Sequence, residues 1–380
     1  MTDTLSPFTD EEEMFRRTVR EFLDRELEPH YKRFEAEGSL PRAFWRKAGE
    51  AGILAPTLPE AHGGAGASEI CYAIVSTELR RSIGSATVGS CLSIDLSHHM
   101  LVQCGSEPQL ARFAPRILAG EIIPALGLTE PDAGSDATAI RTVALRDGDD
   151  YLVNGSKTFI TNGCSANLIY LVAKTDPAAR GKGMSMLLVE GDPPGLTRRR
   201  LKTMGHAIGD VAELHFDNVR VPAANLLGRE GGAMGILMST FAAERLGMGA
   251  GSLGAAELGF SLALDYVKQR NVFGQAVFDY QNTQFKFAEM KTEIETGRAL
   301  LHEGIRKCRA GRFSLADGAM MKLWLCEMEG RVLDQCLQFF GGSGYMDDMP
   351  ISRLYTAARL QRIYGGTSEL QKVAIARTLQ

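Results

Sequence analysis

The stretch LGLTEPDAGSD, residues 126–136, decides the fold of this chain. Its first residues are apolar and have the pattern of a short strand, and a polar turn around Gly134 follows them directly. The turn carries Thr129, Glu130, Gly134, Ser135 and Asp136, so it brings hydroxyl groups and backbone N–H groups close together. Such a turn either ends a strand or holds a ligand, and the sequence around it has to decide between the two.

Residues 121–232, which surround this turn, have the pattern of a β-domain. Short β-branched or alternating runs are separated by turn sequences such as RDGDD and DPPG. We therefore predict an antiparallel, barrel-like β-domain over residues 121–232. The runs predicted to form strands include IIPALGL, LIYLVAK, MSMLLVE and VAELHFDNVRVP.

The regions on both sides, residues 1–120 and 233–380, are predicted to be helical domains. Thr9 and Glu12 are spaced as a capping box, and an apolar stripe at helical spacing follows them. The overall prediction is an α+β fold in which the β-domain is inserted between an N-terminal helical domain and a C-terminal bundle of long helices. In the bundle, long helices are expected near 233–270, 281–310 and 314–340, with a shorter one after Thr367.

Composition narrows the class of function. The 380 residues carry a formal net charge of −4 and are 44% hydrophobic, which is typical of an ordinary globular protein. Basic residues do not gather, so we expect no nucleic-acid partner. No apolar run approaches the length of about 18 residues that a membrane helix needs, and the acidic N-terminus is unlike a targeting peptide, so we expect a cytoplasmic protein without a membrane partner.

The seven cysteines are scattered and form no C-x-x-C pair, which indicates neither a disulfide framework nor a zinc site. We interpret them as small core residues. The adjacent His98 and His99 point to different faces of a helix and do not indicate a metal site. The triple arginine 198–200 is interpreted as a solvated strand or loop, with a contact to phosphate or a partner protein as the alternative. The cysteines are at positions 71, 91, 104, 164, 308, 326 and 336.

Two motifs that suggest known enzyme classes fail in context. GAGSLG places glycines at 249, 251 and 254, in the G-x-G-x-x-G pattern of dinucleotide-binding folds, but helical sequence flanks it on both sides. We interpret it as a helix whose small residues allow another helix or a flat ligand to pack closely. The chain has no G-x-S-x-G nucleophile elbow either.

Four further stretches accompany LGLTEPDAGSD. Together the five motifs resemble the acyl-CoA dehydrogenase family of flavoproteins, in the family's order and spacing and over nearly the whole chain. They are most similar to the long-chain and isovaleryl-CoA dehydrogenase type. The four stretches are NGSKTFITNG at 154–163, MGHAIGDVAELHFDNVRVP at 204–222, QRNVFGQAVFDYQNTQFKFAEM at 269–290 and QFFGGSGYMDDMPISRLYTAARLQRIYGGTSELQKVAIAR at 338–377.

The resemblance implies a C-terminal four-helix bundle, a homotetramer, and FAD held non-covalently across a subunit interface. It also implies that one group of residues lines the flavin, a second holds the cofactor after the glycine pair at 365–366, and a third reaches the FAD of a neighbouring subunit. An arginine suits the third group because a guanidinium pairs bidentately with phosphate, although a helix C-terminal charge is the other interpretation of Arg270. The three groups are Leu126, Leu128, Thr129, Gly134, Ser135, Phe159, Ile160 and Thr161; Thr367, Ser368 and Glu369; and Arg270, Gln281, Gln338, Gly341 and Gly342.

The catalytic base is implied by the same resemblance. Many family members carry it where this chain has Gly365, in the segment RIYGGTSEL. A minority take it from a glutamate that precedes an arginine on a bundle helix, and FAAERLGMG supplies Glu244 followed by Arg245. Apolar flanks predict a desolvated Glu244 with a raised pKa, and the N–H of residue 365 would stabilise the enolate-like oxygen. The expected substrate contacts are Ser135, Arg245, Tyr364, Gly365 and Gly366.

The implied reaction is α,β-desaturation of an acyl-CoA thioester to the trans-2-enoyl-CoA. Glu244 takes the α-proton, the β-hydride passes to flavin N5, and electron-transferring flavoprotein reoxidises the flavin. Tyr364 stands where isovaleryl-CoA dehydrogenase has a small residue, so the resemblance favours the long-chain enzymes. A carrier-protein thioester or a terpenoid acyl chain remains an alternative substrate. A flavin oxidase or monooxygenase on the same fold, and a non-catalytic acyl-CoA-binding flavoprotein, are the alternative functions.

Overall fold

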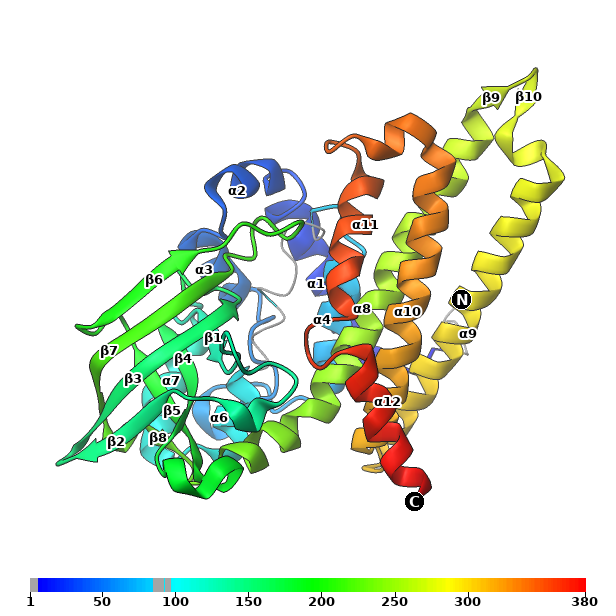
Figure 1. The fold of residues 1–380 in the computed structure, drawn as a ribbon. Coiled ribbons are helices and arrows are strands. Elements are labelled where there is room, and N and C mark those ends of the chain that lie inside the picture. Colours follow the sequence, from blue (N-terminus) through cyan, green and yellow to red (C-terminus); the bar gives the residue numbers. More distant parts are fainter. Residues whose placement is uncertain (1–5, 85–91, 93–96) are drawn as a thin grey trace. The chain divides into compact units, whose positions relative to one another are not determined.

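The computed structural model describes residues 6–84, 92 and 97–380. It divides the chain into two compact units, each assembled from separate stretches of sequence. We call them the helical unit and the sheet unit, and Figure 1 shows the elements of both. The helical unit comprises Met1–Pro29, Glu69–Thr87 and Phe241–Gln380, and the sheet unit comprises His30–Ser68 and Val88–Thr240.

The sheet unit contains an eight-stranded sheet with the order β6-β7-β3-β2-β4-β5-β8, and β1 pairs with β4. LIYLVAK and MSMLLVE form β4 and β5 over their full length, because these runs are buried on both faces. The strands are β1 Pro124–Gly127, β2 Val143–Asp147, β3 Asp150–Ile160, β4 Leu168–Lys174, β5 Met184–Glu190, β6 Leu196–Arg200, β7 Ala212–Pro222 and β8 Leu226–Leu227.

One feature of the sheet differs from the sequence-based expectation of an antiparallel domain. β1 runs parallel to β4, from Pro124 beside Leu168 to Gly127 beside Leu171, and β2 meets β4 in parallel at one position. The other pairs of this sheet are antiparallel. Parallel neighbours need a long connection rather than a hairpin, and here β2 and β3 lie between β1 and β4 in the sequence. The sheet is therefore mixed.

Among the described residues of the sheet unit, four α-helices lie wholly within it, and one of them, α6, carries the two adjacent histidines. His98 is buried and its Nδ1 lies 2.8 Å from the hydroxyl of Tyr170 on β4, whereas His99 Nε2 lies 2.6 Å from Gln103 Nε2. Within the described residues, no group of three or more His, Cys, Asp or Glu side chains is placed to hold a metal ion. The helices are α2 Tyr31–Glu37, α3 Arg42–Glu50, α6 Ser97–Cys104 and α7 Glu107–Leu118.

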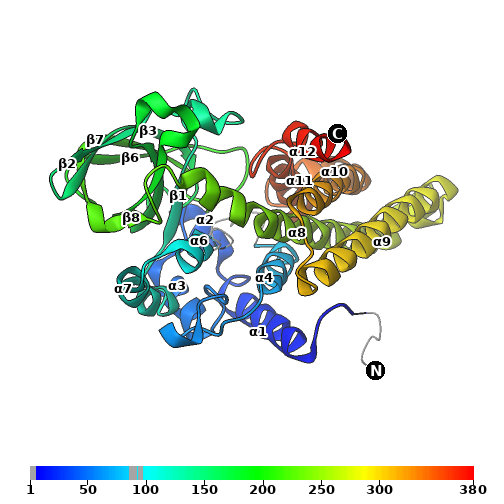
Figure 2. The same cartoon turned by 90° about the horizontal axis from the view of Figure 1, so that it is seen from below.

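The helical unit is a bundle in which α11 and α12 pack against α10 (Figures 1 and 2). The capping box of Thr9 and Glu12 is present at the start of α1. α11 was not expected from the sequence, although Pro350 at its first position and apolar residues at helical spacing are signals for it. The helices are α1 Asp10–Glu26, α4 Ile70–Arg80, α8 Ala233–Gln269, α9 Gln281–Arg309, α10 Leu315–Phe340, α11 Pro350–Gln361 and α12 Ser368–Ala376. Residues 233–240 of α8 belong to the sheet unit.

The glycines of GAGSLG lie in the middle of α8, so the dinucleotide-fold interpretation is excluded. A Cβ on Gly249 would lie 2.9 Å from Leu325 of α10, and one on Gly254 would lie 2.6 Å from the carbonyl of Thr77 on α4. The sequence predicted that another helix or a flat ligand packs against these glycines. The structure shows helices there, α10 and α4. Among the described residues, no helix is both long and apolar enough to cross a membrane.

The triple arginine forms β6 and ties the sheet unit together. Arg198 donates to the carbonyls of Gly163 and Gly191 at 2.8 and 3.0 Å, and Arg200 pairs with Asp210 at 2.9 Å. Arg198 and Arg200 thus form their hydrogen bonds and ion pair with residues of the sheet unit. Of the cysteines, Cys71, Cys326 and Cys336 are buried as expected, Cys104, Cys164 and Cys308 are only half-buried, and Cys91 lies outside the described residues.

Candidate active site

Glu244 lies one turn of α8 beyond Thr240 and is half-buried between fully buried neighbours. Burial raises the pKa of its carboxyl group, and the positive charges of Arg245 and Lys322 act against this rise. The physical cause is the loss of water around the carboxylate. The apolar flanks noted in the sequence thus produce the environment that a proton-accepting carboxylate requires.

The two glycines at 365 and 366 form a turn that passes over Glu244. Both have left-handed backbone conformations, with φ of +60° and +86°. A Cβ on Gly365 would lie 2.5 Å from the sulfur of Met248 and 3.4 Å from Oε1 of Glu244. Glycine is therefore required here both by the backbone and by the space left beside α8.

The carbonyl groups of this turn are held from two sides. Gln371 donates through Nε2 to the carbonyl of Gly366 at 2.8 Å and to that of Gly365 at 3.3 Å. Lys322 donates to the carbonyl of Gly366 at 2.7 Å. Within the part of the chain that the structure describes, the N–H groups of Gly365 and Gly366 donate no hydrogen bond. The N–H of Gly365 thus remains available to bind an oxygen atom of a ligand.

Arg245 and Tyr364, two expected substrate contacts, have partners inside the helical unit. Arg245 is buried, donates to the carbonyl of Leu315 at 3.4 Å and lies over the ring of Phe241. Burial lowers the pKa of Arg245, with Glu244 acting against this. The hydroxyl of Tyr364 donates to Gln361 Oε1 at 3.1 Å, and burial raises the pKa of Tyr364. Both side chains are thus engaged by neighbours within the helical unit.

In the sheet unit, the segment that opens with Leu126 lies beside the end of β3. The N–H of Thr158 donates to the carbonyl of Thr129 at 2.9 Å. Lys157, with 0% of its side chain exposed, donates to the carbonyl of Leu128 at 3.0 Å and pairs with Glu130 at 2.7 Å. Burial lowers the pKa of Lys157 to about 8, against the opposing charge of Glu130. This buried pair fixes the two segments that the sequence assigned to the flavin.

The side chains on these two segments form an open, partly apolar surface. Phe159 has a left-handed backbone with φ of +58° and is 69% exposed. A Cβ on Gly134 would meet no atom within 4 Å, so the backbone there is open to a ligand. Ile160 differs from its neighbours because its side chain is buried in the sheet core. Of the remaining expected residues here, Leu126, Leu128, Thr129 and Thr161 are half-buried and Ser135 is exposed.

The residues that follow the glycine pair start α12. Thr367 is the N-cap and accepts a hydrogen bond from the N–H of Leu370 at 3.3 Å. Ser368 is buried and donates to Glu327 at 2.7 Å, whereas Glu369 is exposed. The N–H groups at such a helix start favour an anion.

The residues expected to reach a neighbouring subunit lie at one end of the bundle. Arg270 follows α8 directly, and Gly341 and Gly342 follow α10. The two helix ends are held together by the rings of Tyr266 and Phe340, which stack with centroids 4.3 Å apart. Within the single chain Arg270, Gln281, Gln338, Gly341 and Gly342 are all exposed.

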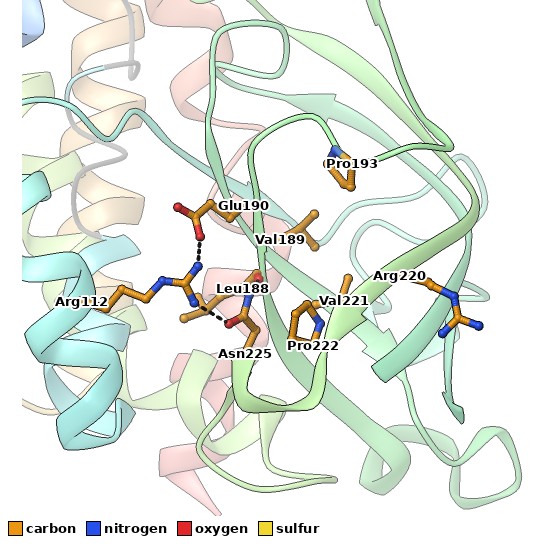
Figure 3. Close-up of a pocket in the computed structure, with 9 residues that line it drawn as sticks. All are labelled: Arg112, Leu188, Val189, Glu190, Pro193, Arg220, Val221, Pro222 and Asn225. Atoms are coloured by element: carbon orange, nitrogen blue, oxygen red, sulfur yellow. Dashed lines mark hydrogen bonds and ion pairs between the residues drawn. The ribbon is translucent and has the colours of Figure 1, made fainter. Parts of the chain in front are cut away.

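A surface pocket of the sheet unit contains none of the expected site residues. Its volume is about 240 Å³, below the range of roughly 300–1,000 Å³ typical of ligand pockets. Figure 3 shows that Arg112 within it is bonded to Glu190 and to Asn225, the latter at 3.2 Å. We therefore assign it no part of the cofactor site. It is lined by Arg112, Leu188, Val189, Glu190, Pro193, Arg220, Val221, Pro222 and Asn225.

Comparison with known protein families identifies all three segments of the chain. Residues 9–121 match the N-terminal domain of acyl-CoA dehydrogenase, residues 125–219 match its middle domain and residues 232–380 match its C-terminal domain. The chain belongs to the acyl-CoA dehydrogenase family. Its helical and sheet elements have the fold of that family, as the sequence motifs predicted.

Individual relatives agree with this assignment. The chain is 40% identical to the mitochondrial long-chain specific acyl-CoA dehydrogenase of Sus scrofa, over 98% of this chain and 87% of that protein. It is 42% identical to the crystal structure of an acyl-CoA dehydrogenase from Geobacillus kaustophilus, with a TM-score of 0.94 over 98% of this chain and 99% of that one. A glutaryl-CoA dehydrogenase from Mycobacterium smegmatis in complex with FADH2 is 30% identical, with a TM-score of 0.90 over 100% and 96% of the two chains. The protein is thus an FAD-dependent acyl-CoA dehydrogenase and an oxidoreductase of fatty acid metabolism.

The residues of this acyl-CoA dehydrogenase fit FAD. In the sheet unit, the exposed side chain of Phe159, the half-buried Thr129 and the open backbone at Gly134 offer an aromatic face together with a hydroxyl and backbone N–H groups. A flavin ring has this combination of a flat apolar body and polar edge atoms. The start of α12 and the guanidinium of Arg270 offer donors suited to phosphate groups.

Sequence reasoning missed two buried lysines, Lys157 and Lys322, that bind the segments carrying the expected site residues of this acyl-CoA dehydrogenase. Lys157 donates to the carbonyl of Leu128 at 3.0 Å, and Lys322 donates to that of Gly366 at 2.7 Å. Glu130 accepts hydrogen bonds from the N–H groups of Arg141 and Thr142 at 2.5 and 3.0 Å. A lysine inside an otherwise apolar pattern, as in GAMMKLWLC, is the signal that points to such a residue.

Proposed function

We propose that this acyl-CoA dehydrogenase converts a long straight-chain acyl-CoA to its trans-2-enoyl-CoA, with Glu244 as the base. The observation that carries the proposal is the position of Glu244. Its carboxylate lies beside the cleared Gly365 turn, where a Cβ would be 3.4 Å from Oε1. The base is thus next to the N–H that would bind the thioester oxygen.

The two groups have complementary tasks in the reaction. The hydrogen on the carbon next to a thioester is weakly acidic, so the negative charge that develops on the carbonyl oxygen has to be stabilised as the proton leaves. The N–H of Gly365 donates to that oxygen. Glu244 accepts the proton, and its raised pKa makes it a stronger base than an ordinary carboxylate.

The cofactor and the further partners complete the proposal. FAD, when bound, supplies the acceptor for the hydride that leaves the β-carbon. Electron-transferring flavoprotein then receives the electrons from a homotetrameric enzyme in the cytoplasm. The resemblance of the motifs to the family supports the electron acceptor and the homotetramer.

The chain length of the substrate is inferred from Tyr364. This large side chain is held by Gln361 next to the turn, which supports a straight chain over a chain branched near the thioester. Steady-state assays with an artificial electron acceptor test this over a panel from butyryl-CoA to stearoyl-CoA and isovaleryl-CoA. A preference for isovaleryl-CoA would contradict the assignment.

The role of Glu244 is tested by Glu244→Gln, which keeps the shape of the side chain and removes its basicity. General-base catalysis typically contributes about 10²-fold to 10⁴-fold, so anaerobic flavin reduction by palmitoyl-CoA should slow by that order while FAD content stays unchanged. Glu303→Gln, an exposed change on α9, is the matched control. Unchanged flavin reduction in Glu244→Gln would show that another group is the base.

The same anaerobic experiment separates the alternative functions. A flavin that no acyl-CoA reduces would indicate a non-catalytic acyl-CoA-binding flavoprotein. A reduced enzyme that consumes oxygen rapidly while substrate is bound would indicate an oxidase or monooxygenase. Slow reoxidation in air is the result expected for a dehydrogenase.

A further inference from the structure

Lys322 is a buried cation that the proposed reaction leaves without a task. It lies on α10 with only 1% of its surface exposed. Its ammonium group donates to the carbonyl of Gln361 at 3.0 Å and to that of Gly366 at 2.7 Å. Within the described ranges it forms no ion pair with a carboxylate. A buried ammonium without such a partner is costly, so its retention calls for a reason.

The two carbonyl groups that Lys322 binds lie on either side of Gly365. Gln361 is the last residue of α11, and Gly366 is the second residue of the turn. An ammonium that binds both fixes the path of the chain between them. That path includes the N–H of Gly365, so Lys322 determines where this donor points.

The titratable groups around Lys322 come from two helices. On α8 these are Glu244 and Arg245, and on α10 they are the thiol of Cys326 and the carboxylate of Glu327. Burial lowers the pKa of Lys322, and Cys326, Glu244 and Glu327 act against this. Glu327 is engaged elsewhere, with Arg362 at 3.3 Å and Ser368 at 2.7 Å. Glu244 is the other carboxylate of this group, and within the described residues it forms no hydrogen bond or ion pair.

We propose that Lys322 is a positioning residue of the reaction: its ammonium fixes the turn that carries the Gly365 N–H and supplies positive charge to the carboxylate of Glu244. The inference rests on the proposed role of Glu244 as the base. Lys322 thereby acts on both groups that proton abstraction needs: the Glu244 carboxylate, which accepts the proton, and the Gly365 N–H, which donates to the thioester oxygen.

Gln371 provides the control that separates these two effects. It donates to the carbonyls of the same turn, but it is neutral. Lys322→Met and Gln371→Met each remove a tether from Gly366, and only the first also removes a charge. Lys322→Gln removes the charge while keeping an amide donor, and Lys322→Arg keeps the charge.

The measured quantity is the pH dependence of anaerobic flavin reduction by saturating palmitoyl-CoA in holoenzyme of equal FAD content. The base must be ionised, so the rate rises with pH through the pKa of Glu244 in the complex. Without the charge of Lys322 that pKa is higher, so the rising limb should move to higher pH in Lys322→Met and Lys322→Gln. On the acid side the rate falls about tenfold for each pH unit of movement. The limb should stay in place in Gln371→Met and Lys322→Arg.

The rate at the high-pH plateau reports the position of the turn. A displacement of reacting groups on the ångström scale costs up to about 10²-fold, so Lys322→Met and Gln371→Met should both lower the plateau. The proposal would be overturned if the rising limb of the pH profile moved equally in Lys322→Met and Gln371→Met, or moved in neither variant. It would also be overturned by loss of FAD or of folding in both uncharged Lys322 variants while Lys322→Arg retains them, since Lys322 would then be only structural. Full activity of Glu244→Gln would instead overturn the proposed function itself.

Discussion

At position 365 the missing side chain leaves room for two groups, the sulfur of Met248 and the carboxylate of Glu244. The left-handed backbone there would cost an L-residue about 1–2 kcal/mol even in open space. Gly311 provides the comparison, because it has nearly the same φ of +63° and a Cβ there would meet nothing within 4 Å. The two glycines thus share the conformational demand and differ in the space around them.

We predict that Gly311→Ala lowers the free energy of unfolding by about 1–2 kcal/mol, and that Gly365→Ala lowers it by more because its Cβ would also lie 2.5 Å from the sulfur of Met248. Only Gly365→Ala should slow flavin reduction, because its methyl group displaces Met248 next to Glu244. Thermal unfolding and anaerobic flavin reduction of both variants test this. Equal rates in the two variants would show that the space at Gly365 has no role in the reaction.

At the scale of the elements, α8 is held between α4 and α10 by close contacts and by one buried ion pair. Arg80 of α4 and Glu329 of α10 pair at 2.6 Å with almost no exposed surface. Burial raises the pKa of Glu329, and Arg80 acts against this. Within the described part of the chain, Nε and Nη1 of Arg80 and Oε2 of Glu329 have no hydrogen-bond partner. The contacts of this ion pair therefore offset only part of the free-energy cost of burying its two charges.

Removing one member of this pair should be more harmful than removing both. Glu329→Leu leaves a buried, unpaired guanidinium and is expected to cost about 3–5 kcal/mol. Arg80→Met combined with Glu329→Leu should recover most of that loss, because no charge remains buried. The thermal midpoint of the single and double variants measures these losses of stability. Glu295→Leu is the control, because it breaks an exposed ion pair with Lys291 and should cost only about 0–1 kcal/mol. A double variant as unstable as Glu329→Leu would contradict this account.

The elements also show which parts of the fold sequence patterns reveal. LIYLVAK and MSMLLVE could be predicted to the residue because local apolar runs and flanking turns fix their ends. The parallel pairing of β1 with β4 could not, since it depends on residues about 40 positions apart. Glu244 was found from the resemblance of its motif. Lys322 was missed because its partners are backbone carbonyls, which no side-chain pattern encodes.

At the scale of the whole molecule, each unit is assembled from stretches far apart in the sequence. α1 and α4 belong to the helical unit although α2 and α3 lie between them in the chain. Helical periodicity predicts that these segments are helices, but it contains no information about the unit in which each one packs. That choice depends on long-range contacts such as Arg20 with Glu78 at 2.8 Å.

The proposed homotetramer gives a prediction about FAD retention and assembly. Arg270 and Gln281 are exposed in the single chain, and the proposed homotetramer would place them against a neighbouring subunit's FAD. Arg270→Ala and Gln281→Ala should therefore weaken FAD retention and the tetramer together. Flavin absorbance after gel filtration and sedimentation velocity measure the two effects, with the exposed Arg306→Ala as control. Tight FAD in a stable monomer would contradict the prediction.

The closeness of Gly365 to Glu244 also restricts how such an enzyme can evolve. A glutamate introduced at 365 would carry its Cβ 3.4 Å from Oε1 of Glu244, which brings two carboxylates into one desolvated space. With Glu244 as the proposed base, losing it first would leave no base on either element. Every single-step route between the two base positions therefore passes through an impaired ancestor, and a lineage that has adopted one arrangement is held in it by natural selection.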